Sequence, residues 1–285
     1  MKRWMQHISI FMLMIVVALG IFSKPAYAAT DHPEFVITPD GTLTEYHGMG
    51  GDVVIPDGVT AIGARAFASC NTIKTVKFSN SVKVIKESAF DSCNELEKVT
   101  LSKQLKTIET SAFWGCRNLT SIQIPDSVTT IEFAAFCNCD MLNGIQLPKT
   151  VKKIGNYAVG FHFSDGYTLA DDYAIIGENG TAAKQYADKY KVFFLTKKDL
   201  NVKNILVKKK TETKRSVKWS KNTAVKGYEI QYATNQKFKN AKSISVSSQK
   251  NSCIIKGKKI SYIRVRGIRT IAGKKYYSDW KRVRV

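Results

Sequence analysis

Six cysteines and four histidines are the residues of this sequence whose side chains could bind a metal ion or act as nucleophiles. Four of the cysteines recur every 23 residues, at Cys70, Cys93, Cys116 and Cys139. Side chains at a fixed phase point the same way, and parallel Cα–Cβ vectors seldom reach the dihedral angle of about 90° that a disulfide requires. We therefore predict buried free thiols that pack as small apolar groups, with disulfide bonds as the alternative if the chain is exported. A zinc site is less expected, because no CxxC pair or histidine partner accompanies the column.

The other candidates for chemistry are isolated from one another. Cys137 lies outside the column, at a position expected to face outward, and Cys253 lies alone in the C-terminal region. His162 takes the place of the cysteine in a fifth copy of the repeat, where we expect a packing or capping role. The sequence contains no HExxH, GxSxG or P-loop motif. We accordingly predict no enzyme activity, no catalytic residue, no metal and no cofactor, with an unrecognised hydrolase site as the alternative.

The cysteine spacing is one column of a longer repeat, which runs without a gap through four copies (53–75, 76–98, 99–121 and 122–144) into a fifth. An isoleucine, an Ala-Phe pair and a leucine or isoleucine recur at fixed positions in the full copies. One coil of this length cannot enclose its own apolar side chains, whereas stacked coils bury each column as an internal ladder. We predict a solenoid in which each coil contributes one short strand, such as 76–78 or 122–124, to a parallel sheet.

Residues on the outward phase of these strands are the candidate ligand contacts of the solenoid. Five of them are polar: Lys77, Lys98, Thr100, Gln123 and Gln146. Trp114 and Phe133 fall where other copies have different residue types, so we expect these two rings to be exposed and to anchor a partner. Partial packing of the two rings against neighbouring coils is the alternative.

The repeat pattern Leu-x-x-Ile-x-Ile-Pro-x-x-Val-x-x-Ile-x-x-x-Ala-Phe-x-x-Cys, found at 119–139, resembles the BspA-like class of bacterial leucine-rich repeats. The resemblance covers 53–165 and implies adhesion, or binding of host or community surface proteins or glycans, by the solenoid. Because the open ends of a solenoid core must be closed, we expect an N-terminal cap hairpin at 29–52 and a C-terminal cap at 166–196. The C-terminal cap should include a short amphipathic helix over 181–191.

The repeat ends before the last third of the chain, where short alternating segments separated by Lys-, Asn- and Gly-rich turns begin. These segments predict a sandwich of about seven strands over 199–285. Trp219, the Gly-Tyr-x-Ile-x-Tyr segment at 227–232 and the closing Tyr-Ser-Asp-Trp at 277–280 resemble a fibronectin type III domain. The predicted fold class is therefore mainly β: a leucine-rich repeat solenoid of 23-residue coils with a short capping helix, followed by a fibronectin type III-like β-sandwich.

The net charge of +21 is concentrated in the same C-terminal third. Residues 197–285 contain 26 Lys and Arg against 4 Asp and Glu, whereas residues 29–196 contain 15 against 19. Because such a charge repels itself, we predict an anionic partner for the basic domain, with solubility as the alternative. The candidate contacts are Arg264, Arg266, Arg269, Lys274 and Lys275. For an exported chain we expect anionic cell-wall polymers as partners and no nucleic acid as the biological target.

Residues 1–28 have the form of a signal peptide, in which Lys2 and Arg3 precede an apolar run and Ala26-Tyr-Ala28 forms the expected cleavage site. We expect cleavage after Ala28 and no membrane span in the mature chain, with a retained anchor as the alternative. The prediction is a secreted or bacterial cell-surface protein that recognises macromolecules through the solenoid while the basic domain docks on anionic polymers. The alternative is a glycan- or wall-binding module in which the solenoid is only a spacer.

Overall fold

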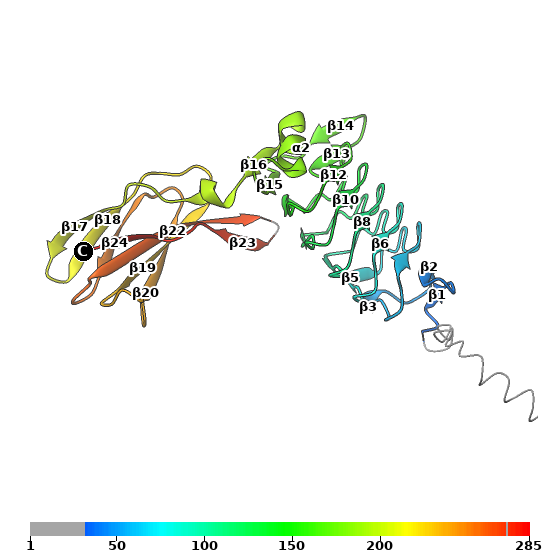
Figure 1. Cartoon of the computed structure of the whole chain (residues 1–285), viewed down its shortest axis with the longest axis horizontal. Helices are drawn as coiled ribbons and strands as arrows, with labels where there is room; N and C mark the ends of the chain where they lie inside the picture. The colour runs from blue at the N-terminus through cyan, green and yellow to red at the C-terminus, as the bar shows by residue number, and fades with distance from the viewer. Residues whose placement is uncertain (1–31, 272) are drawn as a thin grey trace, which may run out of the picture.

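The computed structural model of the chain describes residues 32–271 and 273–285, so the predicted signal peptide lies outside the described residues. The coils stack side by side from an N-terminal hairpin to a C-terminal cap, and a second domain follows beyond the cap (Figure 1). The strands of the coils and of the N-terminal hairpin are β1 (Phe35–Ile37), β2 (Thr42–Tyr46), β3 (Gly51–Val54), β4 (Ala61–Ile62), β5 (Ile73–Lys77), β6 (Val84–Ile85), β7 (Lys98–Thr100), β8 (Thr107–Ile108), β9 (Ser121–Ile122), β10 (Thr130–Ile131), β11 (Gly144–Gln146) and β12 (Lys153–Ile154).

Two sheets run along the solenoid. One has the order β3-β5-β7-β9 and pairs Val76 with Val99 and Val99 with Ile122, which is the 23-residue step of the sequence repeat. The other has the order β1-β2-β4-β6-β8-β10-β12 and pairs Ile62 with Ile85 and so on along the isoleucine column. The prediction of one strand per coil is therefore wrong. The isoleucine column fills the core and also pairs through its backbone, so the coils contribute two short strands each.

Buried phenylalanine rings form a stack through the middle of the solenoid. The ring centroids of Phe67 and Phe90 lie 4.8 Å apart, and those of Phe90, Phe113 and Phe136 follow at 5.2 Å each. Successive rings are inclined by 10° or less. The backbone of this segment is also tied to the next coil, since the Phe113 amide donates to the carbonyl oxygen of Ala135 at 2.8 Å. At these positions, successive coils are thus held together both by ring stacking and by backbone hydrogen bonds.

The cysteine column lies beside the phenylalanine stack, and its thiols are free, as predicted. The Sγ atoms of Cys93, Cys116 and Cys139 donate to the carbonyl oxygen of the phenylalanine one coil earlier, at 3.0, 3.2 and 3.2 Å. The outward position predicted for Cys137 is wrong, because this side chain is fully buried. The cap that follows closes over this end of the stack, where Asn138 accepts a hydrogen bond from the Phe163 amide at 2.7 Å.

The C-terminal cap continues the solenoid with elements of its own. They are β13 (Phe161–Phe163), β14 (Tyr167–Leu169), β15 (Ala174–Ile176), α2 (Ala182–Tyr190) and β16 (Phe193–Leu195). Strand β11 of the last coil pairs with β15, which pairs with β16, while β13 and β14 form a separate hairpin. The helix begins after its N-cap residue Thr181 and ends at Lys191, which is left-handed with φ 59°. Among the described residues, no helix is long and apolar enough to cross a membrane.

The C-terminal domain is a sandwich of two antiparallel sheets, as the predicted fold class requires. Its strands are β17 (Leu206–Thr211), β18 (Lys214–Lys218), β19 (Gly227–Ala233), β20 (Lys242–Ser247), β21 (Ser252–Lys256), β22 (Tyr262–Ile271), β23 (Lys274–Tyr277) and β24 (Lys281–Arg284). One sheet has the order β17-β18-β21 and the other β20-β19-β22-β23, with β24 also on β22. Strands β23 and β24 pair with opposite ends of β22, so they are two halves of one edge strand interrupted at 278–280. Trp219 and Tyr228 fill the core between the sheets, with ring centroids 5.0 Å apart.

A short connection packs the two domains against each other. The 3₁₀-helix η1 (Lys197–Leu200) buries Leu200, and a Cβ atom on Gly267 of β22 would lie 2.3 Å from the Leu200 carbonyl oxygen. Glycine at this position therefore allows the connection to cross the sheet. The Lys197 ammonium also pairs with the Asp279 carboxylate at 2.9 Å. The connection is thus a packed segment of the fold.

Candidate functional site

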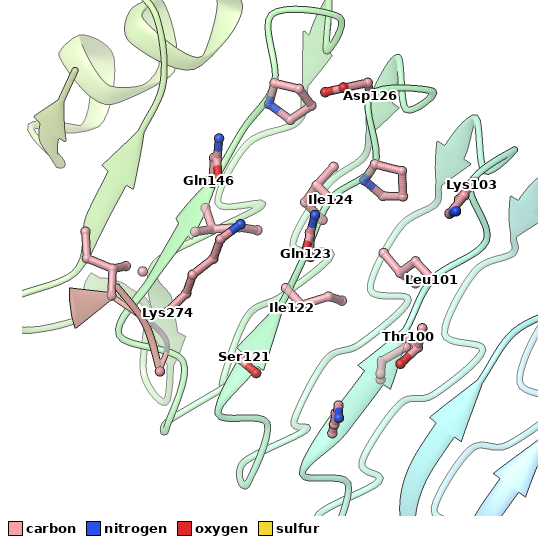
Figure 2. Close-up of a pocket in the computed structure, with 18 of the residues that line it drawn as sticks. Thr100, Leu101, Lys103, Ser121, Ile122, Gln123, Ile124, Asp126, Gln146 and Lys274 are labelled. Atoms are coloured by element: carbon pink, nitrogen blue, oxygen red, sulfur yellow. The ribbon is translucent and has the colours of Figure 1, made fainter. Parts of the chain in front are cut away.

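A groove of about 1010 Å³ lies where the solenoid meets the C-terminal domain. Its floor consists of β7, β9 and β11 with the segments that follow them, and its wall is the hairpin of β22 and β23 (Figure 2). Polar side chains of the floor come from three successive coils: Lys98, Thr100, Ser121, Gln123 and Gln146. The groove thus runs across the repeats and is bounded by both domains.

The sequence repeat explains why these polar groups face the groove. Val99, Ile122 and Ile145 are buried, and residues next to them in an extended chain must point to the opposite face. Thr100 and Gln123 occupy the same position of successive coils, so their strands lie about 4.8 Å apart. The floor therefore presents a row of hydroxyl and amide groups at the spacing of a β-ladder.

The wall is held against the floor by a close contact between a glycine and an aliphatic side chain. Ile271, at the end of β22, is only 3% exposed. A Cβ atom on Gly144 of β11 would lie 2.3 Å from its Cγ2 atom. A larger residue at 144 would clash with Ile271 and with the Ala174 carbonyl oxygen of β15, so glycine here allows the wall to approach the floor.

The charge of the groove is predominantly positive. Lys98 and Lys103 line the floor, Lys274 extends over it from the wall, and Asp126 lies near the rim (Figure 2). Burial raises the pKa of the Tyr276 hydroxyl, which also lines the wall. Its described lining residues include no histidine, cysteine or glutamate, and they offer hydrogen bonds and positive charge. In the described part of the chain, no three His, Cys, Asp or Glu residues are grouped so that they could hold a metal ion.

Comparison with known families identifies the repeat. A model described as the BspA type leucine rich repeat region matches residues 50–165 in six copies. A T. pallidum leucine-rich repeat protein is 31% identical, with 50% of this chain and 67% of that chain covered and a TM-score of 0.44. This chain belongs to the BspA-type leucine-rich repeat family. Repeat proteins of this family bind or recognise other proteins, and they are typically non-catalytic.

Two further solved structures cover other shares of the chain. A leucine-rich cell surface protein from Faecalibacterium prausnitzii is 30% identical, covering 54% of this chain and 39% of that chain, with a TM-score of 0.44. The FN1–FN3 domains of chicken CNTN1 are 22% identical, covering 30% of both chains, with a TM-score of 0.26. The chain therefore spans well under half the length of these two proteins. No curated protein sequence matches the chain.

Four of the five polar residues predicted from the repeat of this BspA-type chain line the groove: Lys98, Thr100, Gln123 and Gln146. Lys77 is exposed on β5, in the same column, but lies outside the groove. Lys274, predicted as part of a separate anion site, joins the groove from the wall. The wall residues Ile271 and Tyr276 escaped sequence reasoning, because no local pattern shows how two domains pack against each other.

The two aromatic residues predicted as hot spots lie elsewhere, and both contact rings of the cap hairpin. The ring centroid of Trp114 lies 5.8 Å from that of Phe163, and the centroid of Phe133 lies 5.8 Å from that of Tyr167. The β13–β14 hairpin thus rests on both rings, although Phe133 stays 38% exposed. Neither ring lines the groove.

Two of the arginines predicted to contact an anionic partner have partners within the domain. The guanidinium of Arg264 donates to Gln231 and stacks on Phe238 and Trp280, at 4.2 and 4.4 Å from the ring centroids. Arg266 forms an ion pair with Glu229, with 2.6 Å between nitrogen and oxygen. These contacts come from neighbouring strands and loops, which sequence alternation alone does not reveal.

Arg269 requires a correction, because it lies on the inner phase of β22 and is only 7% exposed. Its guanidinium donates to the Ala224 carbonyl oxygen at 3.0 Å and lies 4.9 Å from the centroid of the Phe193 ring in the cap. This arginine therefore packs the two domains together and is not available to a polymer. Lys275, on β23, is exposed as expected.

Proposed function

We propose that this protein is exported to the bacterial cell surface and there binds a macromolecule in the groove. In this proposal residues 53–165 carry the recognition surface and residues 199–285 attach the protein to anionic cell-wall polymers. The observation that carries the proposal is the groove itself, whose floor repeats one row of polar groups through three coils and whose wall is a second domain. Membership of a recognition family supports it.

The shape and chemistry of the groove favour an extended ligand, such as a segment of a host or community surface protein or a glycan. A row of hydroxyl and amide groups at ladder spacing can pair with the repeating polar groups of a polymer. Lys98, Lys103 and Lys274 favour segments that carry negative charge. The apolar stems of these lysine side chains provide contact area beneath the charged groups.

Export and surface location rest on two observations. Residues 1–28 have the composition of a signal peptide, and the F. prausnitzii relative is a cell surface protein. Both support a secreted or surface-associated chain that functions outside the bacterial membrane.

A second candidate function is a wall- or glycan-binding module in which the solenoid is a spacer. Charge distribution favours it, because residues 197–285 carry a net charge of +22 while residues 29–196 carry −4. In that case blocking the groove would leave ligand binding intact. The two functions therefore differ in their response to substitutions in the floor.

Gln123→Trp is expected to weaken capture of a protein or glycan ligand at least tenfold, which is about 1.4 kcal/mol, because the indole fills the centre of the floor. Lys77→Trp is the matched control, since Lys77 has the same exposed position two coils earlier, outside the groove. Mature full-length variants would be immobilised and tested against wall fractions and extracellular-matrix proteins, and affinities for the captured molecule measured by surface plasmon resonance. Equal binding by both variants would assign recognition to another surface.

A further inference from the structure

The outer face of the three-stranded sheet in the C-terminal domain carries lysines in register. Along β17, β18 and β21 the pairing sets Leu206 beside Lys218, and Lys218 beside Ser252. Lys208 and Ile254 lie on either side of Ser216 in the next outward row. All of these residues except the central Ser216, which is half-buried, are exposed, so the pairing defines one solvated face.

The third row of this face brings two like charges together. Lys214 of β18 and Lys256 of β21 are direct cross-strand partners, and both are exposed. Side chains of directly opposed residues start about 4.5–5.5 Å apart, and like charges at that position destabilise a sheet. Of the described residues, no carboxylate lies within ion-pair distance of Lys208, Lys214, Lys218 or Lys256. The repulsion on this face is therefore left uncompensated by the protein.

On the other sheet part of the positive charge is compensated. Arg266 pairs with Glu229 and Arg264 donates to Gln231, although Arg264 also faces Arg282 of β24 across the strands. The other three acidic residues of the domain are also engaged: Asp199 accepts from the Thr196 amide, Glu212 pairs with Lys209 in the β17–β18 turn, and Asp279 pairs with Lys197. The face of β17, β18 and β21 is thus an ordered surface of the domain on which positive charge is uncompensated.

We propose that this face, defined by Lys208, Lys214, Lys218 and Lys256, is the docking surface for a linear polyanion with repeated phosphate or sulfate ester groups. The proposal rests on the function proposed above for the C-terminal domain and moves its anion site from the β22 arginines to the opposite sheet. Charge complementarity carries it, because a chain of anionic groups laid across the rows neutralises the lysine repulsion. Successive outward residues of a strand are about 7 Å apart and neighbouring strands about 4.8 Å. Flexible lysine side chains on this grid can reach the successive charges of such a polymer.

The occupant is a polymer rather than a membrane because of the shape of the face. It is the broad side of a twisted sheet, and its exposed aliphatic residues, Leu206 and Ile254, stand singly among polar side chains. Isolated aliphatic side chains on a sheet do not form the continuous apolar stripe with which peripheral proteins enter a lipid interface. They can instead contact the carbon backbone of a polymer between its charged groups.

The test uses the mature full-length protein and a variant with Lys208, Lys214, Lys218 and Lys256 all changed to glutamine. The matched control changes the exposed lysines Lys237, Lys239, Lys242 and Lys250 to glutamine, which removes the same charge outside the proposed face. The probes are purified poly(glycerol phosphate) and a heparin oligosaccharide, with phosphatidylglycerol vesicles as a third arm. Binding is measured by isothermal titration at several salt concentrations.

We expect the face variant to bind the polyanion at least tenfold more weakly at low salt, and the slope of log K against log salt to fall by about 3 in magnitude. The control variant should keep most of the wild-type affinity and most of the salt dependence. The stronger of the two polymer probes identifies phosphate or sulfate as the source of the anionic groups. A second readout is independent of ligand, since Lys256→Gln alone should raise the Tm by a few degrees through relief of the Lys214 repulsion.

Three outcomes would overturn the proposal. Equal losses in the two lysine variants would leave polyanion docking by the domain standing but remove its assignment to this face. Binding of neither polymer by the wild-type protein would reject the anionic docking proposed for the domain itself. Vesicle binding with the same lysine dependence, and no polymer binding, would make the occupant a lipid surface.

Discussion

Replacing Phe113 with alanine is expected to lower the free energy of unfolding by about 3–5 kcal/mol. The ring is fully buried and stacks on Phe90 and Phe136 with centroids 5.2 Å away on each side. Its removal loses apolar burial, leaves a cavity and interrupts the stack at its centre, because neighbouring coils held by backbone hydrogen bonds cannot collapse into the gap. Urea unfolding of the mature protein, followed by far-ultraviolet circular dichroism, measures the change.

Phe133→Ala is the matched control for this prediction. The same ring is removed from the same type of coil, but Phe133 is 38% exposed and packs mainly against the cap hairpin. We expect a loss of about 1 kcal/mol, since partly exposed side chains contribute less apolar burial. Similar losses for the two variants would show that the phenylalanine stack does not hold the coils together.

Raising the pH from 9 to 10 is expected to destabilise the solenoid by about 1 kcal/mol for each buried thiol, or roughly 4 kcal/mol in total. Burial raises the pKa of Cys93 and of Cys137 to about 12, and it raises the pKa of Cys116 and Cys139 further. An unfolded thiol has a pKa near 9.0 and loses its proton in this range, whereas the folded thiol keeps it. Because the unfolded state then binds fewer protons than the folded state, stability is full below pH 9 and falls as pH rises towards the folded pKa.

The measurement is the free energy of unfolding at pH 7.5, 9 and 10 under reducing conditions. Cys93→Ala should reduce the pH-dependent loss by about a quarter, whatever its effect on stability at pH 7.5. Burial also raises the pKa of Tyr173 and Tyr186 above the ordinary value of 10.0, so these tyrosines add their own loss of stability mainly above pH 10, where an unfolded tyrosine loses its proton. A pH dependence that is unchanged by the cysteine substitution would mean that other groups cause the alkaline loss.

The architecture of the solenoid could be predicted because one physical requirement acts on every coil. Positions such as Ile62, Phe67 and Cys93 lie on internal ladders, and each ladder repeats a residue type at 23-residue intervals. The second sheet was missed for a related reason. Two-residue strands such as Ala61–Ile62 are too short to show the alternation by which strands are recognised in a sequence.

The candidate groove could be predicted only in part. The floor residues Thr100 and Gln123 follow from the repeat and from the alternation of side chains along a strand. The wall depends on contacts between residues far apart in the chain, such as Ile271 with Gly144 and Arg269 with Phe193. A local pattern carries no information about such contacts, because either domain could satisfy it in any relative orientation.

The arrangement of the charged residues could also be predicted only in part from the sequence. Composition placed the excess of positive charge in the C-terminal domain, and strand alternation indicated polar faces there. Only the cross-strand register shows that Arg266 has Glu229 beside it while Lys214 faces Lys256. The sequence by itself determined the repeat, the buried columns and the segregation of charge, because these depend on residue type and spacing. The tertiary structure decided which polar groups form the groove and which lysines lack a partner, since both depend on which strands become neighbours.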